Sequence, residues 1–151
     1  VFANDVGLFP SAKTTLEQLR EMNLPLAVAT SSVSASARPL LDRTGIRSFF
    51  SVVITGDEVQ RGKPAPDIYL RAADQLGISA EACLVVEDSL AGMAAAKAAN
   101  MRVAAIPDRR FVDPREYENE GDYVIGSLSE IPTLIRDVNA TEEHAFDRKI
   151  S

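Results

Sequence analysis

Hydrophobic and polar positions follow one another along the chain in blocks rather than singly. Five short, nearly continuous apolar runs are separated by longer stretches in which apolar residues recur every three or four positions. Strand-length runs with little alternation are typical of strands buried on both faces, and the three-to-four spacing is typical of helices. The predicted strands are Leu24–Thr30, Val52–Thr55, Cys83–Val86, Arg102–Ile106 and Tyr123–Ile125.

Helices are predicted between these strands. They begin after Ser11, near Ser36, near Pro66 and near Leu90, and the last of them is nearly all alanine. Ser11 is expected to cap the first helix, and glycine after Leu76 is expected to end the third. Pro39 must lie in the first turn of the second helix or kink it, because proline lacks the N–H that a helix interior uses.

The alternation of strand and helix predicts a parallel sheet with helices on both faces. This fold class is α/β, a doubly wound, Rossmann-like arrangement. The 151 residues fit one ordinary domain. We expect residues 1–10 to be a linker, residues 11–138 the α/β core, and residues 139–151 a polar tail that is weakly ordered or forms a short helix.

The composition limits the binding partners and the catalytic mechanisms that the chain can have. The net charge of −6 argues against nonspecific binding of nucleic acid, and no apolar run approaches the ~18 residues of a membrane span. Cys83 is the only cysteine, so no internal disulfide forms; we expect a small core residue, compatible with a reducing cytoplasm. The only histidine, His144, lies in the polar tail, which disfavours Ser-His and Cys-His mechanisms and zinc sites. Carboxylates, hydroxyls and lysine must carry any chemistry.

Such side chains follow three of the predicted strands, where parallel sheets bind their ligands. Thr30 and Ser31 end the first run, Lys63 follows the second, and Glu87 and Asp88 end the third. A hydroxyl, a backbone N–H and an ammonium together suit a phosphate, and adjacent carboxylates suit Mg²⁺. We therefore expect phosphate binding by Thr30, Ser31 and Lys63, and Mg²⁺ binding by Glu87 and Asp88.

Each of these signals has a more ordinary interpretation when taken alone. Thr-Ser-Ser after a strand is commonly a helix cap, a lone lysine is commonly a solvated surface residue, and Glu-Asp-Ser is commonly a capping turn. Their order and spacing, 33 residues from Thr30 to Lys63 and 25 from Lys63 to Asp88, favour a shared site. Arg109 and Arg110, after the fourth run, either add positive potential to it or are solvated surface.

The stretches GKPAPDIYLRAA and VVEDSLAG together make roughly residues 6–135 resemble the haloacid dehalogenase superfamily. Within it, the chain resembles the phosphatases and phosphomutases similar to beta-phosphoglucomutase and phosphoglycolate phosphatase. The resemblance implies that Thr30 fills the second-motif hydroxyl position and that Lys63 steadies nucleophile and phosphate. It also implies that Glu87 and Asp88 hold Mg²⁺ and that the substrate is a small phosphorylated metabolite.

The chain departs from the family pattern at its beginning. The family opens with an Asp-x-Asp motif, whose first Asp becomes an aspartyl-phosphate and whose second is the general acid/base, followed by a helical cap domain. Asp5 lies in no such motif and follows no apolar strand. We therefore expect the chain to be the C-terminal portion of a longer protein, completed by an N-terminal segment or another chain, and inactive alone.

Without this first strand, the predicted sheet is expected to have a gap. In the family that strand lies between the strands that end at Thr30 and Glu87, so these two strands are expected to face an empty slot unless a compact rearrangement closes it. Buried N–H and C=O groups without partners cost about 1–3 kcal/mol each.

Two functions follow as hypotheses. The first is the core of a cytoplasmic, Mg²⁺-dependent phosphatase or phosphomutase acting on a small phosphorylated metabolite. The alternative is a noncatalytic binding or interaction module on a degenerate fold of the same family. A phospho-receiver domain is disfavoured, because there the acidic pair precedes the lysine, whereas here Thr30 and Lys63 precede Glu87 and Asp88.

Overall fold

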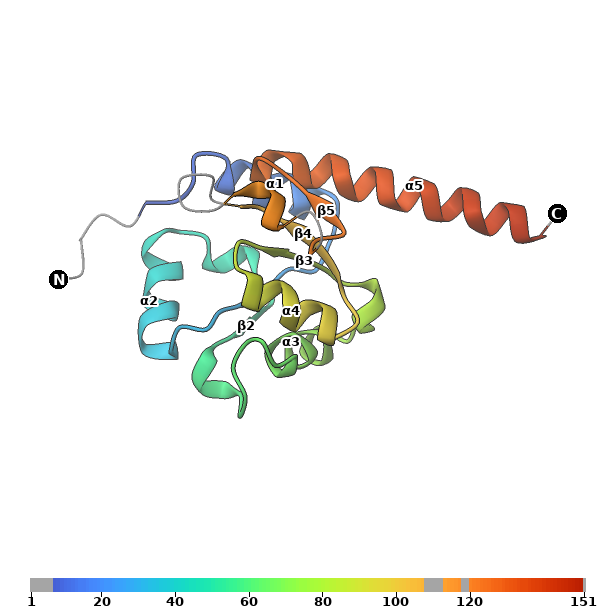
Figure 1. Ribbon diagram of the computed structural model, residues 1–151. Coiled ribbons are helices and arrows are strands. Elements are labelled where there is room, and N and C mark those ends of the chain that lie inside the picture. The colour runs from blue at the N-terminus through green and yellow to red at the C-terminus, as the bar shows by residue number, and fades with distance from the viewer. Residues whose placement is uncertain (1–6, 108–112, 118–119, 151) are drawn as a thin grey trace.

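The computed structural model of the protein describes residues 7–107, 113–117 and 120–150, with the backbone alone at residue 114 and over residues 142–150. Strands and helices alternate as predicted as far as the fourth strand, and short 3₁₀ turns join several elements (Figure 1). Over the described residues, only one such turn lies between the fourth and fifth strands. The elements are α1 (Ala12–Glu21), β1 (Ala27–Ala29), α2 (Ser34–Arg43), β2 (Val52–Ile54), α3 (Asp67–Leu76), β3 (Leu84–Glu87), α4 (Leu90–Ala98), β4 (Arg102–Ala105), β5 (Tyr123–Val124) and α5 (Ile131–Ile150).

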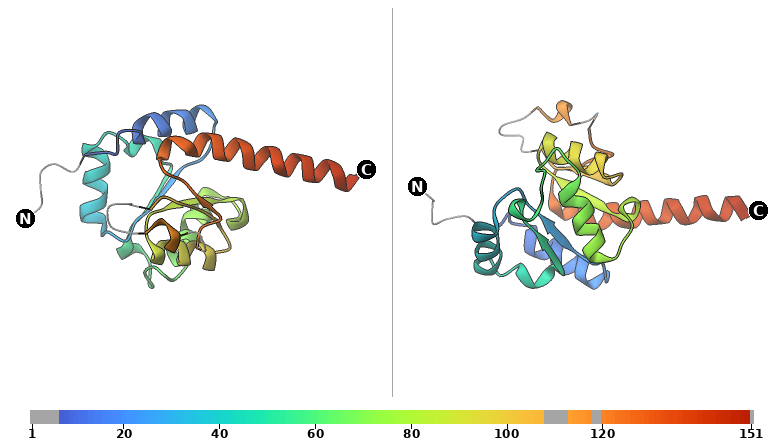
Figure 2. Two further views of the ribbon diagram at one scale, coloured as in Figure 1. Left: turned by 45° about the horizontal axis from the view of Figure 1, so that its top comes forward. Right: turned by 90° about the horizontal axis from the view of Figure 1, so that it is seen from below.

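The helices cover two opposite faces of the strands. Val85, Val103 and Ala105 belong to one hydrophobic cluster with the buried residues of α3 and α4. The neighbouring residues on the same strands, among them Val86 and Ala104, belong to a second cluster with α1 and the start of α5. Because successive strand residues point to opposite faces, this division confirms the α/β fold with helices on both faces, which Figure 2 shows from two sides.

Every strand pairing is parallel, but the strands form two separate sheets. β1 pairs with β2, and β3 pairs with β4, which pairs in turn with β5. Within the described residues, no strand pairing joins β1 to β3. Over the described residues, the strand edges that precede Thr30 and Asp88 are therefore not paired with each other; we call the space between these two edges the slot.

The beginning of α2 differs from the prediction. The helix starts at Ser34 rather than Ser36, and Pro39 lies in its interior rather than in its first turn. The Ser34 N–H donates to the Asp57 carboxylate at 2.9 Å, so a residue far along the chain supplies an N-terminal partner. A contact between residues this far apart in the chain cannot be predicted from local sequence patterns.

Ser11 also behaves differently from the prediction. It precedes α1, but its side chain makes no capping hydrogen bond. Its backbone carbonyl accepts the Thr15 N–H at 2.9 Å, and its hydroxyl lies 3.5 Å from the Ser127 hydroxyl. The side chain of Ser11 thus contacts the turn before α5 instead of its own helix.

Helix α5 begins against the body and then extends away from it (Figure 1). Ile131 is buried, and Leu134 and Ile135 pack against the same cluster as α1. The segment 139–150, expected as a weakly ordered or short helical tail, continues this helix without interruption. Residue 138 is therefore not the end of an element.

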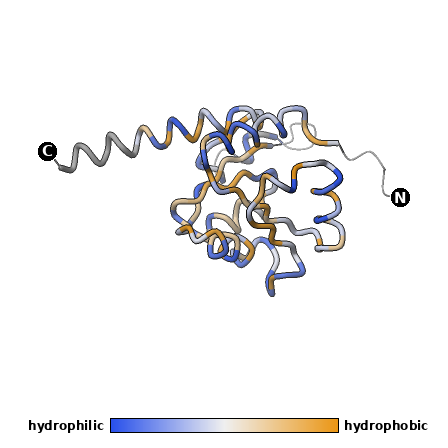
Figure 3. Tube along the Cα trace, turned by 180° about the vertical axis from the view of Figure 1, so that it is seen from behind, coloured by the Kyte–Doolittle hydropathy of each residue, from blue (hydrophilic) through white to orange (hydrophobic). Residues whose placement is uncertain are grey.

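Hydrophobic positions gather in the interior of the body, as Figure 3 shows. Val103, Ala104 and Ala105 of β4 are fully buried, and so are Ala95 and Ala96 of α4. The small alanine side chains let α4 approach the strands closely. In the part of the chain that the structure describes, no helix combines the length and apolar character needed to cross a bilayer.

Candidate functional site

An ion pair connects the two sides of the slot. Lys63 lies in the loop between β2 and α3, and its Nζ donates to the Ala29 carbonyl of β1 at 3.3 Å. The same ammonium donates to Oε1 of Glu87, the last residue of β3. The two side chains are only 10% and 7% exposed, so the pair is shielded from water. Lys63 therefore links the strand edges that do not pair with each other.

Both oxygens of the Glu87 carboxylate are heavily engaged. Oε1 accepts the Tyr69 hydroxyl at 2.7 Å in addition to Lys63. Oε2 accepts the Asp88 N–H at 3.0 Å, the Ser89 N–H at 3.1 Å and the Ser89 hydroxyl at 2.9 Å. Burial alone raises the pKa of Glu87, but the hydrogen bonds from Lys63 and Tyr69 outweigh it and bring the pKa below its ordinary value. Glu87 is therefore held as a carboxylate.

Asp88 has the opposite environment. It is exposed, and its side chain makes no hydrogen bond or ion pair with another described residue. Over residues 7–107, 113–117 and 120–141, no group of three or more His, Cys, Asp or Glu side chains is arranged to hold a metal. Mg²⁺ is commonly bound by one or two carboxylates together with phosphate oxygens and water. The Asp88 carboxylate fits that role, whereas the Glu87 oxygens already have partners.

The loop after β1 presents a hydroxyl and a backbone N–H. The Thr30 Oγ1 accepts the Ser32 N–H at 3.2 Å, which leaves the hydroxyl proton of Thr30 free to donate. Ser31 is exposed, and its N–H makes no hydrogen bond within the described residues. Since Thr30 directly follows Ala29, these donors lie at the same strand end as the Lys63 ammonium.

The turn after β2 holds this loop in place. The Gly56 N–H donates to the Ser32 carbonyl at 2.9 Å. Asp57 accepts the Thr55 hydroxyl at 2.6 Å and the Ser34 N–H at 2.9 Å, and these hydrogen bonds lower the pKa of Asp57 in that order. A Cβ at Gly56 would lie 2.3 Å from the Ser31 carbonyl oxygen, so only glycine allows this approach.

We expect Gly56→Ala to destabilise the chain by about 1–3 kcal/mol and to displace the Thr30–Ser31 loop, because the added methyl group meets backbone atoms. Urea unfolding measures the first effect, and amide chemical shifts of the loop measure the second. Gly62→Ala is the matched control, because a Cβ there meets nothing within 4 Å. Equal stability of the two variants would contradict the tight approach.

The structure brings together most of the predicted site residues. Lys63 and Glu87 are in direct contact, Thr30 and Ser31 adjoin the carbonyl that Lys63 binds, and Asp88 adjoins Glu87. Asp5, Arg109, Arg110 and the side chain of His144 lie outside the described residues.

Cys83 is only partly buried and packs against the edge of the α3 and α4 core, rather than lying within the core as expected. Its thiol donates to the Ser79 carbonyl at 3.4 Å, and burial raises the pKa of the thiol. It has no place in the site.

Four residues of the site were not predicted: Gly56, Tyr69, Ser89 and Gly92. Tyr69 lies on the inner face of α3, and a hydroxyl among apolar residues at helical spacing was the available signal in the sequence. Ser89 accepts the Gly92 N–H at 3.1 Å while it donates to Glu87. A Cβ at Gly92 would lie 2.0 Å from the Glu87 carboxyl carbon. This contact joins the N-terminus of α4 to the end of β3.

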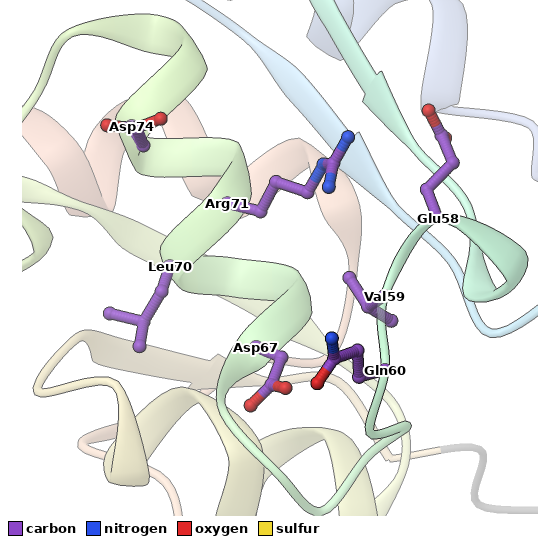
Figure 4. Close-up of a pocket in the computed structure, with 7 residues that line it drawn as sticks. All are labelled: Glu58, Val59, Gln60, Asp67, Leu70, Arg71 and Asp74. Atoms are coloured by element: carbon purple, nitrogen blue, oxygen red, sulfur yellow. The ribbon is translucent and has the colours of Figure 1, made fainter.

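A separate hollow lies between α3 and the loop after β2 (Figure 4). Its polar lining consists of three acids, one arginine and a glutamine: Glu58, Asp67, Asp74, Arg71 and Gln60. No predicted site residue lines it. Asp67 is already bound by Arg61, whose Nη2 lies 2.6 Å from Oδ1. We assign it no ligand.

The arrangement of a parallel sheet, a strand-end hydroxyl, a loop lysine and an acidic strand end is that of a known class. The chain belongs to the haloacid dehalogenase-like hydrolases, whose family model matches residues 1–100. The resemblance predicted from the sequence is thereby confirmed.

Particular relatives are similar over part of their length. The CbbY protein of Rhodobacter capsulatus is 40% identical over 110 residues, which are 71% of this chain and 48% of that protein. Phosphoglycolate phosphatase of Escherichia coli K12 is 44% identical over 92 residues, 61% of this chain and 36% of that protein. The crystal structure of a mutant CbbY from Rhodobacter sphaeroides in complex with xylulose-(1,5)bisphosphate superposes with a TM-score of 0.73 at 31% identity, over 82% of this chain and 56% of that one. The chain thus spans about half or less of the length of these two curated relatives.

Proposed function

We propose that the chain supplies the phosphate- and cation-binding part of a phosphatase or phosphomutase that acts on a small phosphorylated metabolite. The observation that carries the proposal is the Lys63 ammonium, held between Ala29 and Glu87 at the strand ends where Thr30, Ser31 and Asp88 also lie. The similarity to phosphoglycolate phosphatase and to a CbbY that binds xylulose-(1,5)bisphosphate supports the substrate class.

The residues of the chain have separable roles in this proposal. An ammonium has three N–H donors, and two of those on Lys63 are engaged, so one is available to a phosphate oxygen. The Thr30 hydroxyl and the Ser31 N–H donate to the same group. Such fixed donors stabilise the charge that develops on a phosphoryl group in transit.

Asp88 is the proposed ligand of Mg²⁺, and Glu87, the other expected ligand, is proposed to act chiefly by holding Lys63. Bound Mg²⁺ would neutralise the charge on the phosphate oxygens. The acid that attacks phosphorus is proposed to come from an Asp-x-Asp strand placed in the slot between β1 and β3, since the sequence contains no Asp-x-Asp. The phosphoryl group would pass to that aspartate as its bond to the substrate oxygen breaks and the substrate alcohol leaves, and then to water or a sugar hydroxyl, which frees the aspartate. The chain alone is accordingly proposed to be inactive.

The test uses the complete gene product that contains this chain. We expect it to release phosphate from small phosphomonoesters with Mg²⁺ and the 151-residue chain alone to release none. Asp88→Asn in the complete protein should weaken the binding of Mn²⁺, which electron paramagnetic resonance measures. We expect the affinity to fall by more than ~10–100-fold, which is the typical loss when a residue that only contacts a metal ligand is replaced. Asp74→Asn, an exposed acid on α3, is the matched control.

Two outcomes would contradict the proposal. If the complete protein hydrolyses no phosphomonoester and Asp88→Asn leaves the metal affinity unchanged, the noncatalytic binding module is favoured. If the chain alone turns over substrate, it contains a nucleophile outside the proposed set. The cytoplasmic location stays a prediction, drawn from the single cysteine.

A further inference from the structure

Tyr69 contacts both members of the buried ion pair. Its side chain lies on the inner face of α3 and is 6% exposed. The hydroxyl donates to Glu87 Oε1 at 2.7 Å, the same oxygen that accepts the Lys63 ammonium. The Lys63 Nζ also lies 4.8 Å from the centroid of the Tyr69 ring, within the range of a cation–π contact.

The hydroxyl and the ring act on different partners. A carboxylate oxygen has two lone-pair directions, and those of Glu87 Oε1 are taken by Lys63 and Tyr69. With three donors on Oε2, the carboxylate has no freedom to rotate without breaking a hydrogen bond. The ring supplies a second, independent contact to the Lys63 ammonium. Tyr69 therefore restrains the ion pair at both ends.

The tyrosine remains a donor under ordinary conditions. Burial, followed by the hydrogen bond to Glu87, raises the pKa of Tyr69 above its usual value. The charged and titratable groups that face its hydroxyl are Lys63, Glu87 and Asp88. Because the phenol keeps its proton, it donates to Glu87 and does not compete with it for the ammonium.

We propose that Tyr69 is a positioning residue. Its hydroxyl keeps the Glu87 carboxylate oriented toward Lys63, and this fixes the ammonium with one N–H available to a phosphate oxygen. This inference rests on the proposed function, and it adds a residue that contacts neither phosphate nor metal. A phenylalanine would fill the same space among Ile68, Ala72 and Ala73, so packing alone does not require the hydroxyl.

The test compares Tyr69→Phe with the wild-type chain by two measurements. The first is the ¹⁵N-edited NMR signal of the Lys63 ammonium, which is resolvable because the chain has only four lysines. The second is titration with inorganic phosphate. We expect the Lys63 signal to shift and broaden, and the dissociation constant for phosphate to rise roughly three- to tenfold, as loss of a hydrogen bond to a charged group predicts.

Tyr117→Phe is the matched control. Tyr117 is 3% exposed, and its hydroxyl donates to the Asp88 carbonyl at 2.8 Å, so the variant also loses a hydroxyl from a buried tyrosine. Its Lys63 signal should stay in place, and its phosphate affinity should change less than about twofold, since the Asp88 carbonyl that loses the Tyr117 hydroxyl is an uncharged acceptor. Thermal melting of each variant ensures that the comparison uses fully folded protein.

The outcomes separate the two proposals. An unchanged Lys63 signal in folded Tyr69→Phe overturns the positioning role, even where stability falls. A shifted signal with unchanged phosphate affinity also overturns it, because the ammonium is then not held for phosphate by the hydroxyl. If the wild-type chain binds no phosphate while Tyr69→Phe still moves the Lys63 signal, the proposed function fails and the restraint on the ion pair stands.

Discussion

Replacing Lys63 with methionine is expected to destabilise the chain by about 3–5 kcal/mol, because it leaves the charge of Glu87 buried without its partner. Methionine preserves much of the volume, so the loss reports on charge rather than packing. Chemical denaturation at neutral pH measures it. The same variant should lose measurable binding of inorganic phosphate, since the proposed third N–H is gone.

The double variant Lys63→Met/Glu87→Gln is the control, because it removes both charges. It should recover a large part of the stability, and the double-mutant cycle should show strong coupling between the two positions. A single Lys63→Met variant within about 1 kcal/mol of wild type would contradict a buried pair, since exposed pairs contribute about that much or less.

The Lys63→Met penalty should also depend on pH. The pKa of Glu87 lies below its ordinary value of 4.5 in the folded wild type. The Glu87 carboxylate therefore contributes stability above pH 4.5, which is lost as the pH falls through its lower folded pKa. In Lys63→Met, protonation of Glu87 relieves the unpaired charge, so the difference between variant and wild type should shrink on acidification.

The second large effect is expected at Gly92. Helix propensity alone predicts that Gly92→Ala stabilises α4 by about 1 kcal/mol. The structure predicts the opposite sign, because the new Cβ would lie 2.0 Å from the Glu87 carboxyl carbon and must displace a carboxylate held by five hydrogen bonds. We expect a loss of about 3 kcal/mol or more.

Thermal and urea unfolding of Gly92→Ala measure this loss, and the Lys63 ammonium signal shows whether the ion pair moves. Ala91→Gly, at an exposed position of the same helix, is the control for propensity and should cost about 1 kcal/mol. A Gly92→Ala variant more stable than wild type would show that Glu87 accommodates the methyl group.

The elements could be predicted from the sequence because their signals are local. Apolar runs marked all five strands, and the spacing of Ile68, Ala72 and Leu76 marked α3 together with Gly77, which has a positive φ of 69°. The site residues Thr30, Lys63 and Asp88 could be selected because the carboxyl ends of parallel strands meet at one edge of a sheet.

What escaped prediction depends on contacts between distant segments. The start of α2 requires Asp57, and the glycines at 56 and 92 are required by the Ser31 carbonyl and the Glu87 carboxylate. The different proposed roles of Glu87 and Asp88 likewise cannot be read from the sequence, in which the two acidic residues are simply adjacent. The burial of Glu87 and the exposure of Asp88 separate the proposed anchor of Lys63 from the proposed Mg²⁺ ligand.

The slot between the two sheets also affects how readily the native chain opens locally. All three residues of β1 are only partly buried, whereas Val103, Ala104 and Ala105 of β4 are fully buried. Amide groups on unpaired, partly hydrated edges exchange with solvent at a lower free-energy cost than those of an interior strand. We therefore expect the backbone that flanks the Lys63 ion pair to exchange faster than the backbone of β4, and a strand bound there would stabilise the whole domain by closing the slot.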